Sequence, residues 1–521
     1  MNALKNSSAA NNPSSIHPDR LFLGSCFALI STSVAFGVVT SMMGDFKTVF
    51  ALSNTEAGLI GGAALWGFTI TIFIFGPLCD AIGMKKLMRF SMICHLVGPL
   101  LMIFAQGFST LFAGALIIAL ANGTVEAVCN PLVTTIYPER KTQKLNQFHV
   151  WFPGGIVIGG LLAFGIDNID AARWEALPLA SWQVKLSLVL IPTLIYGVLF
   201  SGQNFPATER VQSGLSFGEM VKATLLRPLF LLLFFCMSLT ASLELGPGRW
   251  MGEVMGTVMS QFGGTNSGIL VLVYGSGLMA ILRFFAGPVI HRLSPTGLLA
   301  CSAILAGLGL MVLTYAQGAL AIFVAATVFY VGVCYFWPTM LGVASERVPK
   351  GGALALGLLG GWGMAVVGLI TVPVMGLITD IYGHEKLPVQ ETTICIQEGA
   401  ALLPKIKQNE PGDAVGNIDE TIALVNEVNS AVTASGALPK ISTSKALRGI
   451  ALYAPETETG ANAQSLIKPA DDYGGIISFR WVAATSLILI MVFGILYLSD
   501  RAKGGYRVEK IGGGPTADPD A

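Results

Sequence analysis

The segment GPLCDAIGMKKLM, residues 76–88, lies between two long apolar runs and contains its only charges in a short turn. Gly76 lets a neighbouring helix approach closely, and Gly83 permits a tight turn. Asp80 is placed to cap or pair at a helix end, and the two lysines favour the cytoplasmic side of a membrane. We expect a structural gate here, and an ordinary loop held on the cytoplasmic side by its lysines is the alternative. Its predicted residues are Gly76, Asp80, Gly83, Lys85, Lys86 and, from the second half of the chain, Arg283.

The composition around this segment is that of a membrane protein. Of the 521 residues, 53% are hydrophobic and 12% are charged, and mean hydropathy is +0.67. Soluble domains carry about 25% charged residues. A helical span needs about 20 apolar residues, and open sheet edges cannot lie in lipid, so the fold class is all-α. The twelve predicted spans are 21–43, 57–78, 87–106, 110–136, 148–167, 183–202, 228–247, 266–290, 297–316, 319–343, 353–380 and 479–499.

Lys and Arg concentrate in alternate connections and in both tails, which predicts cytoplasmic termini and an integral protein of the cell's inner membrane. The longest cytoplasmic connection divides the spans six and six. The predicted parts are an N-terminal tail (1–20), a first half (21–202), an inter-half loop (203–227), a second half (228–499) with an outer insert (384–474), and a C-terminal tail (500–521).

The outer insert is polar but contains apolar residues at helical spacing, which predicts at least one amphipathic helix. These residues are Ile418, Ile422, Val425, Val428 and Val432. A loosely ordered loop is the alternative interpretation.

The second half contains a segment that is weakly similar to residues 76–88. GPVIHRLSPTGLL, residues 287–299, follows the eighth predicted span as GPLCDAIGMKKLM follows the second. The placement fits a six-plus-six duplication, and transporters built from two related halves bind their solute between them. The first copy matches the G-x-x-x-D-x-x-G-x-K/R-K/R loop and so resembles the major facilitator superfamily. That resemblance implies twelve helices in two six-helix pseudo-repeat halves.

One acid lies inside an otherwise uncharged apolar run, in NGTVEAVCNP, residues 122–131. A carboxylate near mid-bilayer costs a few kcal/mol and is tolerated where it faces a polar cavity or carries a proton. Asn122, Glu126 and Asn130 recur every four residues and form one predicted polar stripe, and Pro131 bends the helix beside it. Glu126 is predicted to bind a proton or a solute. A purely structural, neutralised Glu126 is the alternative.

The run NGTVEAVCNPLVTTIYPERKTQKLNQF, residues 122–148, resembles the fourth span and following loop of the fucose:proton symporter family. This resemblance implies that Glu126 couples transport to protons. The chain also departs from the family. Thr40 stands where the symporters carry a second acid, and His149 and Phe152 stand where they carry a sugar-binding Gln and Asn. These departures weaken fucose itself as the solute.

Several other side chains are candidates for binding a solute, each with a structural alternative. His149 can instead be an interfacial residue, Trp151 an interface anchor, and Glu244 an outer-surface ion pair with Arg249. The complete predicted substrate-binding set is Asn122, Asn130, Thr40, His149, Trp151, Phe152, Glu244, Tyr274 and Trp337.

Together these features predict a secondary active transporter that moves a small polar solute, a monosaccharide, by proton symport and alternating access. A proton-coupled exporter or antiporter of other organic compounds is the alternative, and a receptor using the 384–474 insert ranks below both. The sequence contains no metal-ligand spacing, no nucleotide-binding G-x-x-x-x-G-K-[ST] and no nucleophile–base set. We therefore expect no cofactor, no metal, no enzyme activity and no nucleic-acid partner. The expected partners are the solute, protons and membrane lipid, and the expected state is a monomer.

Overall fold

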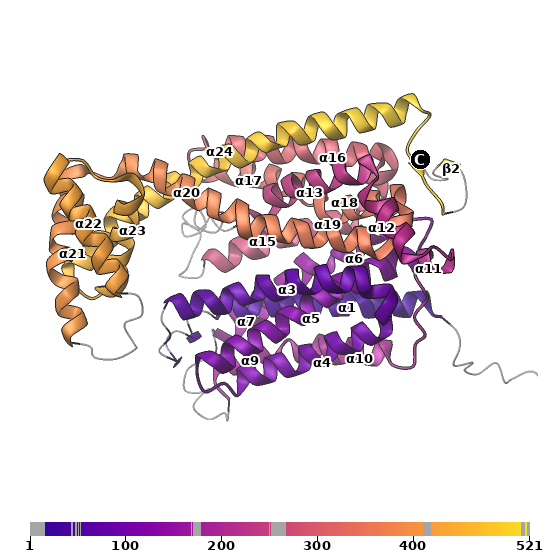
Figure 1. Cartoon of the computed structure of the whole chain (residues 1–521), viewed down its shortest axis with the longest axis horizontal. Helices are drawn as coiled ribbons and strands as arrows, with labels where there is room; N and C mark the ends of the chain where they lie inside the picture. Colours follow the sequence, from indigo (N-terminus) through magenta and orange to yellow (C-terminus); the bar gives the residue numbers. More distant parts are fainter. Residues whose placement is uncertain are drawn as a thin grey trace, which may run out of the picture.

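Two groups of long apolar helices lie side by side, one from each half of the chain (Figure 1). The computed structural model describes residues 16–42, 45–46, 49–50, 52, 54–167, 169, 179–248, 251, 267–409, 418–511 and 516–517. The first group contains α1 (Pro18–Ser41), α3 (Asn54–Ile82), α4 (Met84–Ile103), α5 (Phe108–Ile136), α6 (Lys141–His149), α7 (Trp151–Asp167), α9 (Ser181–Ser187) and α10 (Leu190–Phe200).

The second group follows a connection that holds two short helices, α11 (Glu209–Gln212) and α12 (Phe217–Leu225). Its elements are α13 (Pro228–Leu245), α15 (Ser267–Phe284), α16 (Ala286–Leu313), α17 (Ala319–Val333), α18 (Phe336–Arg347), η2 (Pro349–Gly351), α19 (Gly352–Val366), η3 (Val367–Thr371), α20 (Val372–Gly383) and α24 (Glu458–Ala502). Within the described residues, eleven helices are long and apolar enough to cross a membrane, and the shorter apolar helix Val273–Phe284 occupies the eighth predicted span. The predicted all-α fold class is therefore confirmed.

Several predicted spans are broken rather than continuous, and proline accounts for two of the breaks. Proline has no N–H for the carbonyl four residues earlier, so the helix ladder is interrupted there. Pro153 lies just after the α6–α7 boundary, and Pro338 lies in the first turn of α18, just after the α17–α18 boundary. In α16 the break falls at Ser294, whose φ is +59°, immediately before Pro295. These breaks place main-chain polar groups inside the bundle.

The segment between α20 and the last span forms a small helical unit outside the bundle (Figure 1). It contains η4 (His384–Lys386), α21 (Val389–Asn409), α22 (Ile418–Ser435), α23 (Lys440–Tyr453) and the first turns of α24. The helix predicted from the apolar spacing is confirmed as α22, and the loop alternative is wrong for these residues. The apolar core of this unit includes Cys395, Leu403, Val425, Val428, Leu447, Ile450 and Ile467.

An ionic contact joins this outer unit to the bundle. Arg448 on α23 pairs with Asp380 on α20 (2.7 Å) and with Asp471 on α24 (2.5 Å). Because α24 continues for 45 residues from the outer unit through the last span, the unit is attached by two helices and one bridging arginine.

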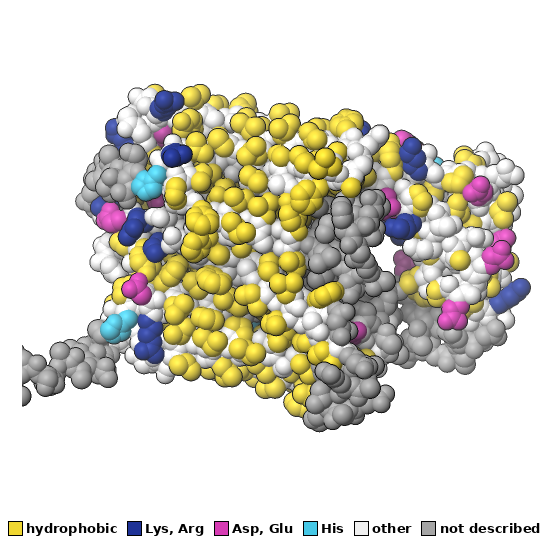
Figure 2. Space-filling view, turned by 180° about the vertical axis from the view of Figure 1, so that it is seen from behind, with side chains coloured by type: hydrophobic (Ala, Val, Ile, Leu, Met, Phe, Trp, Pro, Cys, Tyr) yellow, Lys and Arg dark blue, Asp and Glu magenta, His cyan; other side chains and the backbone are white. Residues whose placement is uncertain are grey.

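The surface agrees with a membrane-embedded bundle. Figure 2 shows hydrophobic side chains covering the middle of the bundle, whereas Lys and Arg gather at the end far from the outer unit. At that end α1 begins and α24 ends (Figure 1), and we call it the termini end. Two short strands, β1 (Arg507–Val508) and β2 (Thr516–Ala517), pair there antiparallel.

The outer unit offers a direct test of its packing. Val428 is fully buried on α22, whereas Asn426 on the same helix is exposed. We expect Val428→Asp to destabilise the unit by at least about 3 kcal/mol, because a buried charge without a partner adds to the lost apolar contact. Limited proteolysis should then cut within residues 389–453 before it cuts the bundle.

The matched control is Asn426→Asp, which adds the same charge to the exposed face of α22 and should leave the cleavage pattern of the native chain. Equal protease resistance of the two variants would contradict a packed core centred on Val428.

Candidate functional site

Glu126 lies on α5 in the middle of a buried polar network. The side-chain amide nitrogen of Asn130, one turn later on the same helix, donates to Glu126 Oε2 (2.7 Å) and to the Glu126 main-chain oxygen (2.9 Å). Asn130 Oδ1 lies 3.0 Å from His149 Nε2, and His149 Nε2 lies 3.9 Å from Glu126 Oε2. The chain thus places an acid, an amide and an imidazole together, away from water.

Arg283 on α15 continues the network into the second half. Its Nη1 donates to the main-chain oxygen of His149 (3.1 Å), and its Nη2 donates to Glu244 Oε1 (2.9 Å). Glu244 Oε2 in turn accepts the main-chain N–H of Trp337 (3.3 Å). Since Trp337 lies in the first turn of α18, its N–H is one of the unpaired donors of a helix start.

We call these six residues the central network: Glu126, Asn130, His149, Arg283, Glu244 and Trp337. Their side chains expose at most 8% of their surface. Consecutive hydrogen bonds connect α5 in the first half to α13 and α18 in the second. A buried network that joins both halves is a place where a proton or a polar solute can affect how the halves pack.

Two of the sequence-based interpretations need correction here. Arg283 was expected in the gate, but it lies in the central network because its donors bind partners at helix breaks. The alternative of an outer-surface ion pair for Glu244 is wrong, since that carboxylate is buried against Arg283. Arg249, its expected partner, lies outside the described residues.

The predicted polar stripe on α5 divides into two. Asn122 does not join Glu126: its Oδ1 lies 2.8 Å from His95 Nε2, and His95 Nδ1 lies 3.1 Å from the Tyr196 hydroxyl. These three buried side chains belong to the packing of α4, α5 and α10 within the first half. His95 is therefore a hydrogen-bonded core histidine.

The aromatic candidates are also distributed differently. The Tyr274 hydroxyl lies 2.5 Å from Thr327 Oγ1 and its ring packs on Phe323, which places it between α15 and α17. The Phe152 ring lies 6.4 Å from that of Phe36 on α1. Trp151 is half-buried at the start of α7, where its main-chain oxygen accepts from the Ser33 hydroxyl (3.2 Å). The side chain of Thr40 lies outside the described part of the chain.

Among the predicted gate residues, Asp80 contacts the inter-half connection. Asp80 Oδ2 accepts from Arg210 Nε (2.6 Å), and Asp80 Oδ1 accepts from the Thr208 hydroxyl (2.6 Å). Gly83 has φ +93°, so the predicted tight turn is confirmed. At Gly76 a Cβ atom would lie 2.7 Å from the Cα of Gly357 on α19, which confirms the close approach of a helix. Lys85 and Lys86 lie in the first turn of α4.

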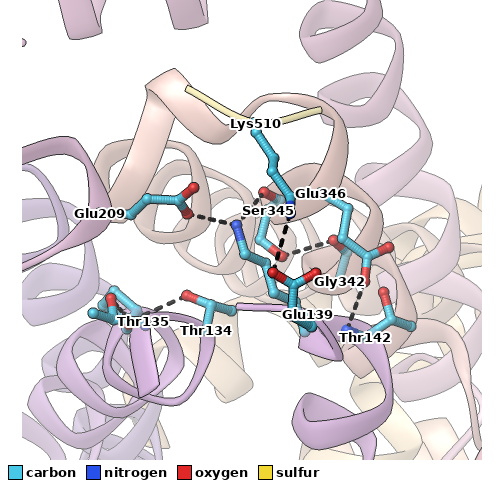
Figure 3. A network of polar contacts seen from close by, with 11 residues as sticks. Thr134, Thr135, Glu139, Thr142, Glu209, Gly342, Ser345, Glu346 and Lys510 are labelled. Atoms are coloured by element: carbon cyan, nitrogen blue, oxygen red, sulfur yellow. Dashed lines mark hydrogen bonds and ion pairs between the residues drawn. The ribbon is translucent and has the colours of Figure 1, made fainter. Parts of the chain in front are cut away.

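A second set of contacts joins the two halves at the termini end (Figure 3). Lys141 Nζ donates to Glu209 Oε2 (2.5 Å) and to the Ser345 main-chain oxygen (3.4 Å). The Thr142 N–H donates to Glu346 Oε1 (2.8 Å). Helices α6 and α18 approach so closely here that a Cβ on Gly342 would lie 2.2 Å from Thr142 Oγ1.

The segment after α24 extends these contacts, which the sequence did not indicate. The Tyr506 hydroxyl donates to Glu346 Oε2 (2.8 Å), and the Glu509 N–H donates to the Glu346 main-chain oxygen (2.8 Å). Burial and the neighbouring Glu346 raise the pKa of Tyr506 well above its usual range, so the phenol remains a donor. Lys510 pairs with Glu139 of the first half (3.1 Å, Figure 3).

The model of the Major Facilitator Superfamily matches residues 21–371. The chain belongs to the Major Facilitator Superfamily. Its homologues and its fold are those of transporters rather than enzymes. The family match and the apolar helices together show an integral membrane protein.

Curated relatives share part of the sequence. The glucose transporter GlcP of Staphylococcus epidermidis is 25% identical over 170 residues, 32% of this chain and 35% of that protein. The L-fucose-proton symporter of Escherichia coli is 24% identical over 204 residues, 35% of this chain and 47% of that protein. The hexuronate transporter of Bacillus subtilis is 27% identical over 149 residues, 29% of this chain and 33% of that protein. The matches span between a third and a half of these relatives.

Solved structures share the fold over most of the chain. The transporter FucP in its outward conformation has a TM-score of 0.55 at 19% identity, covering 69% of this chain and 92% of FucP. The proton:xylose symporter XylE bound to 6-bromo-6-deoxy-D-glucose has a TM-score of 0.57 at 13% identity, covering 69% of this chain and 88% of XylE. The twelve-helix fold in two halves that the resemblance implied is therefore confirmed.

The contact of α6 with α18 can be tested by adding volume. We expect Gly342→Leu to destabilise the arrangement closed at the termini end by about 1–3 kcal/mol, because the new side chain must occupy space that Thr142 fills. Spin labels at the exposed positions Lys86 and Arg501, one in each half, should report a longer distance. Gly494→Leu is the control, since a Cβ there meets no atom within 4 Å. Unchanged distances in Gly342→Leu would refute the contact.

The C-terminal contact predicts a separate effect. Tyr506→Phe removes the hydrogen bond to the buried carboxylate of Glu346 and should cost about 1–3 kcal/mol. Hydrogen exchange of residues 506–510 should accelerate accordingly. Tyr315→Phe removes the hydroxyl of a ring that is 64% exposed and should leave the exchange rates unchanged. Native protection in Tyr506→Phe would show that the hydroxyl does not hold this segment.

Proposed function

We propose that this transporter moves a small polar solute, a monosaccharide, together with a proton. The observation that carries the proposal is the buried Glu126, held by Asn130 and close to His149 in a network that joins both halves. A buried carboxylate can be neutralised by a proton, and its charge state then alters every polar contact around it. The likeness to sugar transporters, including a fucose-proton symporter, supports the same solute class.

Alternating access is the proposed mechanism. The described contacts between the halves at the termini end, from Lys141, Thr142 and Glu346, correspond to an arrangement closed at that end. Glu126 takes a proton from the opposite side, solute binding follows, and the halves then rock to release both. With cytoplasmic termini in an inner membrane, the direction is inward. We propose a monomer as the transporting unit.

Solute contacts belong to the proposal as well. His149 and Asn130 supply hydrogen-bonding groups beside Glu126, and Trp337 supplies an aromatic ring on the facing half. We retain Phe152 and Trp151 as part of the proposed site, because they begin α7 next to His149. Tyr274, Asn122 and Thr40 are the less supported members, since the first two bind neighbours within their own halves.

A proton-coupled exporter of other organic compounds is the second candidate. It is favoured by one specific feature: Phe152 contacts the Phe36 ring and presents no polar group where a sugar-binding amide is expected. The direction of solute movement and competition between solutes separate the two candidates.

The coupling role of Glu126 is directly testable in proteoliposomes suspended in a medium that contains a pH-sensitive dye. A sugar panel should identify a solute that makes the outer medium alkaline as it enters with a proton. We expect Glu126→Gln to abolish accumulation against a gradient, because the amide cannot exchange a proton, while solute exchange persists. Glu391→Gln, which removes an exposed carboxylate of the outer unit, should behave like the native chain.

Two results would contradict this proposal. Accumulation by Glu126→Gln at the native level would remove Glu126 from coupling. If no sugar in the panel changes the outer pH with the folded native protein, the result would favour the exporter and solutes other than sugars.

A further inference from the structure

Two prolines leave main-chain oxygens without helical donors, and Arg283 binds both oxygens. In a regular helix the carbonyl of one residue accepts from the N–H four residues later, which proline lacks. Pro153 therefore frees the oxygen of His149, and Pro338 frees the oxygen of Cys334. Arg283 Nη1 donates to the His149 oxygen (3.1 Å), and its Nε donates to the Cys334 oxygen (2.6 Å).

The three contacts of Arg283 differ in what happens when the halves move. Cys334 and Glu244 belong to the same half as Arg283, so they move with it. His149 belongs to the other half, at the junction of α6 and α7. The bond from Arg283 to the His149 oxygen is therefore the contact that a rocking motion of the halves must stretch or preserve.

His149 also connects this contact to the proposed proton site. Its ring nitrogen Nε2 lies 3.0 Å from Asn130 Oδ1 and 3.9 Å from Glu126 Oε2, while its main-chain oxygen binds Arg283. The ring and the oxygen belong to one residue at a helix break. A change at Glu126 therefore reaches the other half through three hydrogen bonds, which join Glu126 to Asn130, Asn130 to His149, and His149 to Arg283.

We infer that Arg283 is the positioning residue through which the proton on Glu126 sets the packing of the two halves. The inference rests on the proposed function. When Glu126 is ionised, it attracts the permanently charged Arg283 toward the first half and favours the arrangement closed at the termini end. When Glu126 is protonated, Glu244 alone neutralises Arg283, and the preference for the closed arrangement weakens.

The groups around Arg283 are consistent with this direction. Glu244 already supplies one negative charge at 2.9 Å, so ionisation of Glu126 makes the cluster net negative around a single guanidinium. The hydroxyl of Tyr335 donates to the Leu282 oxygen (2.9 Å) beside Arg283. The titratable or charged groups that face the guanidinium are Glu126 from α5, His149 from α6, Glu244 from α13, and Cys334 and Tyr335 between α17 and α18.

The test measures the pH dependence of opening at the termini end in the full chain, with spin labels at Lys86 and Arg501. In the native chain, acidification should raise the ratio of open to closed molecules about tenfold to a hundredfold. This is the change expected when one hydrogen bond to a charged group no longer stabilises the closed arrangement. Arg283→Lys keeps the charge but cannot reach three acceptors at once, so it should lose most of this dependence. Arg89→Lys, on the exposed face of α4, is the control.

Two proline variants separate positioning from simple structural support. Pro153→Ala returns an N–H to the His149 oxygen, so it should weaken the contact between halves and reduce the pH dependence. Pro338→Ala makes the same change at the Cys334 oxygen, within one half, and should leave the pH dependence in place. In proteoliposomes, Arg283→Lys and Pro153→Ala should lower proton-driven uptake about tenfold or more while solute exchange stays near native.

The outcomes distinguish the inference from the function on which it rests. If Glu126→Gln keeps the native pH dependence, the proposed role of Glu126 is wrong, and the inference falls with it. If Glu126→Gln abolishes the dependence but Arg283→Lys or Pro153→Ala retains it, only the inference is overturned. The absence of any pH dependence in the native chain would overturn both.

Discussion

A main-chain oxygen in lipid that has no hydrogen-bond donor costs several kcal/mol, and this constraint organises the centre of the molecule. Pro153 and Pro338 each free such an oxygen within the bundle. Arg283 binds both, and its own charge is then neutralised by Glu244. The helix breaks and the central network are therefore one arrangement, because the breaks create the acceptors that hold a guanidinium there.

Much of the architecture follows from local signals in the sequence. Apolar runs of sufficient length predicted the spans, and the isolated acid Glu126 in such a run predicted a buried polar site. Gly83 was predicted to allow a tight turn and has a positive φ. In each case the signal lies within a few residues of the feature, so the local sequence is enough to predict it.

The predictions that failed concern which helix faces which. Asn122, Glu126 and Asn130 recur every four residues, but four residues turn a helix by about 400°, so each step drifts by about 40°. Over eight residues the drift reaches about 80°, and Asn122 consequently meets His95 while Asn130 meets His149. Arg283 was expected near the gate because its sequence neighbours echo the opening segment. Its partners come from three other helices, which periodicity does not specify.

The outer unit changes what can be seen of this transporter. Membrane bundles of this kind show few features beyond the bilayer, which makes individual particle images hard to orient. Here α24 runs unbroken from the outer unit into the last span, and Arg448 bridges it to α20. The unit is therefore a natural fiducial for aligning particles in electron cryo-microscopy, and no antibody fragment has to be added. Because it is fixed to one half, the tilt of the other half can be measured relative to it.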